Sequence, residues 1–169
     1  MTSQTHSSLL DFTNSVTSAK TEMEIWQALH TFAVEKVGAK LFTFTKVDLD
    51  RNAAIRFYTS DEVAYPVTGE KPVHRDDWFD HVCEKDNLFV ANKIADIADV
   101  FPDYDLINFL GCQSVINIPV RVCGRLIGTA NLLHEENYYT DERVQRAETE
   151  LRQAARIAAL AVSFVENQQ

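Results

Sequence analysis

The chain has 169 residues, of which 46% are hydrophobic and 10% aromatic, so it is long and apolar enough to form one globular domain with a sizeable core. Its 25 acidic residues outnumber its 16 Lys and Arg residues, and the formal net charge is −9. Nucleic acids and anionic membranes are bound by concentrated positive charge, so the composition predicts neither partner.

The chain begins with two predicted helices. Residues 1–20 are polar, with apolar side chains near helical spacing, and predict an N-terminal helix rather than a signal peptide. A second helix is predicted from Thr21, which forms a capping box with Glu24, to a stop at Gly38. The apolar residues of the first helix are Leu9, Leu10, Phe12 and Val16.

Two strands and a long irregular segment follow. The stretch KLFTFTKVDLDRNAAIRFYTS predicts two strands joined by the polar turn 50–52. Residues 61–109 contain a predicted short helix, DDWFDHVCEK, a short strand, LFVA, and an aromatic-rich loop, DVFPDYDLINF. Long connections of this kind tend to be lids or binding loops, so we expect the segment to cover a binding site.

The stretch 110–135, LGCQSVINIPVRVCGRLIGTANLLHE, predicts a hairpin in which each strand has one apolar and one mixed face. Opposed residues of an antiparallel pair share a face, so matching the two apolar faces requires an odd number of loop residues. We expect a three-residue loop, 123–125, with Gly124 at a positive φ. This register places Asn117 opposite Asn131 at the centre of the mixed face.

Two amides inside a sheet need hydrogen-bond partners, because an unsatisfied buried polar group costs about 1–3 kcal/mol. The amides can satisfy each other, a loop or water; alternatively, they contact a ligand beneath the insertion. We expect a pocket with residues from both the sheet and the insertion. Its predicted ligand-binding residues are Asn117, Thr129, Asn131, Trp78, Phe101 and Tyr104.

A long helix, capped by Thr140 or Asp141, closes the chain. Seven of its residues form an uninterrupted heptad seam, and we expect a homodimer through the terminal helices, which Glu at positions 154 and 158 would separate. The alternative is that the stripe is buried within one subunit. The seam is Val144, Ala147, Leu151, Ala154, Ala158, Ala161 and Val165, and a neighbouring row is Ile157, Leu160 and Phe164.

Helices and strands that do not alternate as βαβ units favour an α+β fold with an antiparallel sheet. The hairpin and the helix start YTDE at 139–142 resemble the GAF domain family over roughly residues 20–166. The resemblance implies one GAF-like domain over 1–169, with an N-terminal helix at 1–20 and the GAF core with its C-terminal helix at 21–166. It implies five or six antiparallel strands, with terminal helices on one face and a ligand pocket under the long insertion on the other. The matching positions are Ser114, Pro119, Gly124, Ile127 and Gly128.

The specialised sites of the family are mostly not matched. His134 and Glu135 stand where cyclic-nucleotide-binding members have Asn-Lys, which argues against that ligand. Phytochrome-like members attach a bilin to a Cys followed by His, whereas Glu84 and Gln113 follow the two candidate cysteines, so no covalent bilin is expected. The ligand or cofactor is therefore left unidentified, and the histidines at 74 and 81 lack a recognisable metal-binding spacing.

Enzymatic members of the family reduce free methionine sulfoxide with loop cysteines and acidic residues on the hairpin strands. The matching positions here are Val115, Asn131 and Leu133, and Cys112 lies closer to Pro119 than the attacking cysteine of that family does. We therefore expect no catalytic residue and no enzyme, but a stand-alone sensory or regulatory domain that binds a small molecule non-covalently. A thiol-dependent free methionine sulfoxide reductase and a dimerisation module with a vestigial pocket are the alternatives.

The remaining expectations concern location and signalling. Three cysteines without a CxxC pair do not form a disulfide framework, and no apolar run approaches the roughly 20 residues of a membrane-spanning helix. We expect a cytoplasmic protein. Because no output domain is recognisable, any signal would pass to a separate signalling partner or through assembly.

Overall fold

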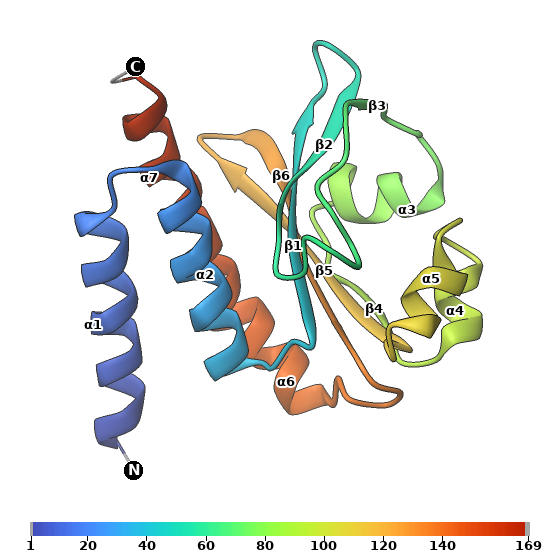
Figure 1. The fold of residues 1–169 in the computed structure, drawn as a ribbon, viewed down its shortest axis with the longest axis horizontal. Coiled ribbons are helices and arrows are strands. Elements are labelled where there is room, and N and C mark those ends of the chain that lie inside the picture. The colour runs from blue at the N-terminus through green and yellow to red at the C-terminus, as the bar shows by residue number, and fades with distance from the viewer. Residues whose placement is uncertain (1, 168–169) are drawn as a thin grey trace.

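The computed structural model describes residues 2–167, with side chains from Leu9 onward. A six-stranded sheet, in the order β3-β2-β1-β6-β5-β4, separates two layers of helices, and every neighbouring strand pair is antiparallel (Figure 1). The predicted α+β architecture is thereby confirmed. The strands are β1 (Leu41–Asp48), β2 (Ala53–Thr59), β3 (Lys71–Pro72), β4 (Phe89–Ala91), β5 (Ser114–Val122) and β6 (Arg125–His134).

The two helical layers differ in regularity. The terminal helices α2 (Glu22–Lys36) and α7 (Arg152–Glu166) cover one face of the sheet, and α1 (Thr2–Ser18) packs on the outer side of α2 (Figure 1). The insertion lies on the other face and contributes only short pieces. These are α3 (Asp77–Phe79), which continues as the π-helical turn η1 (Asp80–Glu84), α4 (Ile94–Ala98) and α5 (Tyr104–Phe109).

Local signals set both ends of α2. Thr21 accepts a hydrogen bond from the backbone N–H of Glu24, and the Glu24 carboxylate accepts from the backbone N–H groups of Lys20 and Thr21. These backbone hydrogen bonds, the one from Lys20 first, lower the pKa of Glu24. Beyond the helix, Gly38 has φ +93°, where a side chain would also collide with Tyr138. The predicted cap and stop are both confirmed.

The last loop of the insertion is more helical than predicted. Residues 99–109 were expected to be a loop, but α5 occupies the second half of this stretch. Pro102 lies just before this helix, where a proline is tolerated. Ile107 is the buried residue of α5 and packs in one cluster with Val115 and Leu133 of the sheet. This packing stabilises a helix that is too short to be stable alone.

The hairpin has the predicted register but not the predicted turn. Asn117 pairs with Asn131 and Ile118 with Ala130, as expected. However, the loop has two residues, not three, since Val122 pairs with Arg125. Positive φ angles of 50° and 77° at positions 123 and 124 are those of a type I′ turn, whose twist matches that of the strands.

A bulge on β6 restores the register after the shorter turn. Arg121 pairs with Leu126 and Val120 with Gly128, which leaves Ile127 as an extra residue. Simple alternation from Asn131 would place Leu126 on the helix side and Ile127 beneath the insertion, but the bulge exchanges them: Leu126 joins the cluster beneath the insertion, and Ile127 packs on the helix side. The Cβ of any other residue at Gly128 would lie 2.1 Å from the Thr45 carbonyl oxygen.

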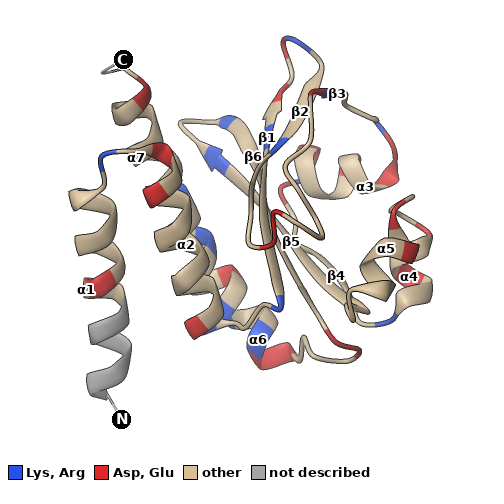
Figure 2. Ribbon diagram, in the orientation of Figure 1, with Lys and Arg blue, Asp and Glu red and all other residues tan. Residues whose placement is uncertain are grey.

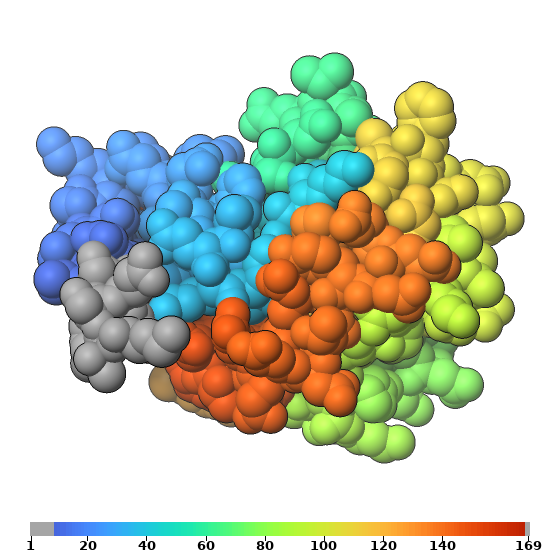
Figure 3. All heavy atoms as spheres, turned by 90° about the horizontal axis from the view of Figure 1, so that it is seen from below, coloured from blue at the N-terminus to red at the C-terminus, as the bar shows by residue number. Residues whose placement is uncertain are grey.

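The main core lies between the sheet and the terminal helices. Trp26 of α2 stacks on Phe44 of β1 with ring centroids 3.9 Å apart, and both are fully buried. Tyr139, just before the closing helix, is also buried in this core. Its backbone N–H donates to Oδ1 of Asn92, and its carbonyl oxygen accepts from Nδ2 of the same residue. Its hydroxyl donates to the carbonyl oxygen of Gly38. Figure 3 shows the chain around Tyr139, in orange, packed between the N-terminal helices and the insertion.

The structure corrects the prediction that the heptad seam of the closing helix faces a partner subunit. The closing helix consists of α6 (Asp141–Arg146), a π-helical turn η2 (Ala147–Leu151) and α7, and its N-cap is Thr140. Four of the seven seam residues are buried inside the subunit, and the rest are partly buried and pack on the same core. The seam therefore faces its own sheet, which heptad spacing alone cannot distinguish from a partner helix. The four buried seam residues are Ala147, Leu151, Ala154 and Ala158.

Charges of both signs are interspersed along the ribbon, and Lys and Arg do not gather on one face (Figure 2). Within residues 2–167, no helix combines the length and the hydropathy needed to cross a bilayer.

Candidate functional site

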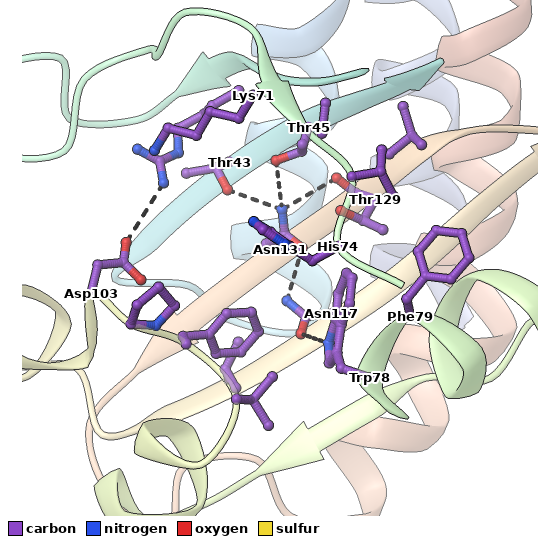
Figure 4. A pocket seen from close by; sticks show the side chains of 18 of the residues that line it. Thr43, Thr45, Lys71, His74, Trp78, Phe79, Asp103, Asn117, Thr129 and Asn131 are labelled. Atoms are coloured by element: carbon purple, nitrogen blue, oxygen red, sulfur yellow. Dashed lines mark hydrogen bonds and ion pairs between the residues drawn. The ribbon is translucent and has the colours of Figure 1, made fainter. Parts of the chain in front are cut away.

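A cavity of about 400 Å³ lies between the sheet and the insertion. Its floor consists of polar side chains from the three central strands, and its cover comes from the insertion (Figure 4). The floor residues are Thr43 and Thr45 of β1, Thr129 and Asn131 of β6, and Asn117 of β5.

A continuous chain of hydrogen bonds crosses this floor. The indole Nε1 of Trp78 donates to Oδ1 of Asn117 at 3.0 Å, and Nδ2 of Asn117 donates to Oδ1 of Asn131 at 2.8 Å. Nδ2 of Asn131 then lies 3.2 Å from Oγ1 of Thr43, 3.5 Å from Oγ1 of Thr45 and 3.3 Å from the carbonyl oxygen of Thr129. The two amides thus satisfy each other, as the first interpretation of the sequence predicts. They also line the cavity beneath the insertion, as the second interpretation requires.

The walls of the cavity are largely apolar. Trp78 and Phe101 meet edge to face with centroids 5.9 Å apart, and Phe79 at the end of α3 is buried. Such a combination of apolar walls and a few convergent polar groups is typical of small-molecule sites. The other apolar lining residues include Ile97, Val100, Ile107, Val115 and Leu133.

Besides Tyr65 and Cys83, five lining residues carry ionisable groups, and three of these five are already engaged. Asp103 accepts a hydrogen bond from the hydroxyl of Tyr65 at 2.6 Å and lies 3.8 Å from the guanidinium of Arg56. That guanidinium in turn stacks 3.7 Å from the centroid of the Tyr65 ring, and burial raises the pKa of this tyrosine. Asp76 accepts from the backbone N–H of Phe79 at 2.9 Å and caps α3.

The other two ionisable groups are free of such partners. Among the described residues, neither Lys71 nor His74 has an ion pair or hydrogen bond to its side chain, although both line the cavity. They come from β3 and from the loop that follows it.

The structure brings five of the six predicted ligand-binding residues to one cavity. Asn117, Thr129 and Asn131 are on its floor, and Trp78 and Phe101 are on its wall. Tyr104, the first residue of α5, does not line the cavity but packs against the apolar cluster around Ile97 and Ile107.

Sequence reasoning missed the contribution of the first strands. Thr43 pairs with Asn131, and Thr45 pairs with Thr129. The alternation in LFTFTKV places both threonines on the face opposite Phe42 and Phe44, so this signal was available. Arg56 of β2 was missed for the same reason, and Lys71 and His74 were missed because their placement depends on the course of the insertion.

None of the three cysteines in the described chain forms a disulfide, and only one lines the cavity. Burial raises the pKa of Cys83 to about 12 and also raises that of Cys112. Cys123 is exposed in the hairpin turn. Because the thiolate is the nucleophile, Cys83 is a weak nucleophile at neutral pH.

Metal ligands do not gather in the described part of the chain, where no group of three or more His, Cys, Asp or Glu side chains is arranged to hold an ion. His81 is bonded to the carbonyl oxygen of Leu88 at 2.9 Å, and His134 stacks on Tyr138.

A cluster of ion pairs joins the cavity wall to the closing helix. Asp86, just beyond η1, lies 2.6 Å from the guanidinium of Arg152, 3.5 Å from that of Arg121 and 4.0 Å from that of Arg156. Arg152 is buried and also pairs with Glu148 at 2.7 Å. Asp86 has a positive φ of 60°, which Asp and Asn tolerate better than most residues.

No protein-family model matches the chain, and no curated protein sequence matches it. Solved structures do. A GAF domain of a two-component sensor histidine kinase from Bacillus halodurans superimposes with a TM-score of 0.69 at 12% identity, covering 89% of this chain and 99% of that one. A GAF domain of a phosphoenolpyruvate-protein phosphotransferase from Coxiella burnetii gives a TM-score of 0.67 at 16% identity, covering 96% of each chain.

The chain has the GAF fold. The free methionine-R-sulfoxide reductase of Neisseria meningitidis, solved with its substrate, shares this fold with a TM-score of 0.64 at 16% identity, covering 94% of this chain and 87% of that one. One GAF fold therefore serves a sensor kinase and an enzyme, and the residues of the cavity must decide between such roles.

Proposed function

We propose that this chain is a GAF-type sensory or regulatory domain that binds a small molecule non-covalently in the cavity beneath the insertion. The observation that carries the proposal is a cavity of about 400 Å³ whose polar floor is fixed by a hydrogen-bond chain and whose walls are apolar. Ligand pockets typically measure about 300–1,000 Å³, so the space suits a small metabolite. The open space also counts against a vestigial pocket filled by its own side chains.

The reductase alternative is supported by the shared fold and by the thiol of Cys83 at the cavity. The raised pKa of this thiol counts against it, as does the absence of carboxylates at the hairpin positions 115, 131 and 133. Replacing all three cysteines by Ser should leave ligand binding intact. If the wild type reduces free methionine sulfoxide and the triple variant does not, the enzyme is the correct assignment.

Native mass spectrometry of protein purified from its own host tests the proposal directly. We expect a bound small molecule whose mass is lost on denaturation. Thr129→Phe, which projects into the cavity from a buried position, should abolish this mass, whereas Thr31→Phe on the exposed face of α2 should retain it. Thermal unfolding checks that both variants fold. The same bound mass in Thr129→Phe would place the ligand elsewhere and contradict the proposal.

We also propose that the terminal helices form a homodimer and that the signal passes to a separate partner or through this assembly. The row on α7 next to the buried seam supports the dimer, because Ile157 is 43%, Leu160 45% and Phe164 70% exposed. Leu9 and Leu10 of α1 are exposed as well. Large apolar side chains gathered on one surface are typical of protein interfaces.

A further inference from the structure

The direction of the hydrogen-bond chain is set at one end by Trp78. An indole N–H can only donate, so the atom of Asn117 that it meets must be the amide oxygen. The Asn117 amino group then faces Asn131 and donates to its oxygen. The same reasoning turns the amino group of Asn131 toward the threonines of β1. A single tryptophan thus fixes the orientation of both amides.

This direction determines what the floor offers to the cavity. The hydroxyl oxygens of Thr43 and Thr45 lie 3.2 and 3.5 Å from the amino group of Asn131, and they share its two N–H groups with the carbonyl oxygen of Thr129, so the proton of each hydroxyl is left to donate. Within residues 2–167, the hydroxyls of Thr43, Thr45 and Thr129 donate to no protein atom. The carbonyl oxygen of Thr129 is already an acceptor for Asn131. The floor therefore presents hydroxyl donors to a ligand.

The ionisable groups around the cavity favour the same polarity. Both lining carboxylates are engaged, Asp103 by Tyr65 and Arg56, and Asp76 by the N-terminus of α3. The Lys71 ammonium has no carboxylate partner in the described chain. The imidazole of His74 carries at least one N–H donor in either charge state. Both residues are exposed at the edge of the cavity, so a protein of net charge −9 has an unpaired cation there.

We propose that the ligand of this cavity is an amphipathic organic anion. Its carboxylate or similar oxyanion accepts hydrogen bonds from the threonine hydroxyls and pairs with Lys71 and His74, and its apolar body lies against Trp78 and Phe101. Hydrogen bonds to a charged group are about twice as strong as neutral ones, so an oxyanion uses these donors best. The inference rests on the proposed function, since it assigns the chemical class of ligand to the same site.

Three probes with one apolar body and different head groups test the charge preference. Phenylacetate is an anion, phenylacetamide is neutral and phenethylamine is a cation. Titrations followed by the NMR signals of the Trp78 indole N–H and of the Asn117 and Asn131 side-chain amides report binding at the cavity itself. We expect phenylacetate to bind at least about tenfold more tightly than either of the other probes.

Matched variants locate the preference. Thr43→Val and Thr45→Val remove one hydroxyl each while keeping the shape, and Lys71→Gln removes the unpartnered cation. Each should weaken phenylacetate binding by about tenfold and phenylacetamide binding by clearly less, because the neutral carbonyl oxygen forms weaker hydrogen bonds and no ion pair. Thr31→Val on the exposed face of α2 should change neither, and thermal unfolding confirms that the variants fold. Equal weakening of both probes, or a preference for the amide or amine, overturns the inference.

The molecule released from host-purified protein separates the two levels of the argument. An anionic species supports both the inference and the proposed function. A neutral or cationic species overturns the inference and leaves the proposed function standing. Empty protein that binds none of the three probes overturns both.

Discussion

The central strands have two contrasting faces. Toward the terminal helices, Ile118, Ala130 and Phe44 meet apolar side chains of α2 and α7, and the space between them is filled. Toward the insertion, their immediate neighbours Asn117, Asn131 and Thr43 bond to one another around a cavity. A period-two alternation within the same strands thus places packed core residues on one face and cavity-lining residues on the other.

The difference follows from what covers each face. Long regular helices present continuous apolar stripes that fit closely against a sheet, so that face closes. The insertion consists of short helical pieces and loops, which leave a gap that its own side chains do not fill. Polar side chains are stable beneath it because they satisfy one another, as buried amides require.

The largest expected effect comes from a charge on the filled face. Ala158→Glu places a carboxylate at a fully buried position between α7 and the sheet. The cost of an unpaired buried charge exceeds the usual net stability of about 5–15 kcal/mol, so we expect the protein to lose its fold rather than only its dimer. Circular dichroism and thermal unfolding measure this. A folded, cooperative Ala158→Glu monomer would show that the buried seam belongs to a dimer after all.

The next effect concerns the ionic link between the faces. Asp86→Asn keeps a residue that tolerates the positive φ but removes the charge that faces buried Arg152. Because Arg152 keeps its pair with Glu148 and the Asp86 side chain is 34% exposed, we expect a loss of about 2 kcal/mol in the free energy of unfolding, measured by urea denaturation. Asp50→Asn, which breaks an ion pair with Arg125 that is 80–90% exposed, should change it by less than about 1 kcal/mol. Equal effects of the two changes would mean that the cluster is not a structural link.

A smaller effect is expected from the amide pair. Asn117→Ala leaves the Trp78 N–H and the Asn131 oxygen without partners and should cost about 1–3 kcal/mol. Replacing both amides by Leu makes the second face resemble the first and removes the unsatisfied Asn131. We expect the double variant to be more stable than Asn117→Ala but unable to bind the phenylacetate probe. Denaturation and NMR titration measure the two properties, and retained binding would exclude the amides from the site.

The buried thiol beneath the insertion gives a pH-dependent effect. The folded-state pKa of Cys83 is raised to about 12, above its unfolded value of about 8.5. Both states keep the proton below the unfolded value, and above it only the unfolded state loses it, so stability falls as pH rises. Wild type should therefore lose more stability than Cys83→Ala between roughly pH 8 and pH 10.5, measured by urea denaturation in reductant. Parallel losses in the two proteins would contradict the burial of this thiol.

The smallest effect on folding is expected at the exposed row of α7. Leu160→Glu should change the free energy of unfolding by about 0.5 kcal/mol or less, since the residue is 45% exposed. It should nevertheless weaken the proposed homodimer, which analytical ultracentrifugation measures. Lys at exposed Gln153 of the same helix is the matched control. A wild type that stays monomeric across micromolar concentrations would remove the dimer from the proposal.

The sequence was informative where a pattern has one structural meaning. Alternation along β5 and β6 predicted both faces and the pairing of Asn117 with Asn131, and the capping box predicted the start of α2. It was uninformative where two structures satisfy the same pattern. A three-residue loop and a two-residue turn with a bulge at Ile127 give the same register for the amides. The heptad spacing of α7 likewise fits its own sheet as well as a partner.

The cavity shows the same limit. The mixed strand face and the irregularly spaced aromatic residues of the insertion predict that Trp78 and Phe101 line it, and the structure places them there. Tyr104 carries the same chemical signal and packs against the same apolar cluster as Phe101, yet it does not line the cavity. Lys71 and His74 reach the cavity only because a two-residue strand runs along the sheet edge, and local patterns do not encode such a path.

The two tryptophans of the chain occupy environments that fluorescence spectroscopy can distinguish. Trp26 is sealed in the filled core against Phe44, whereas Trp78 lies on the cavity wall with its indole bonded to Asn117. In a Trp26→Phe protein, the intrinsic fluorescence would come from Trp78 alone. Its emission maximum and its quenching by iodide would then change when a ligand enters the cavity. Trp78 therefore orients the amides of the floor and also reports, by its fluorescence, whether the cavity is occupied.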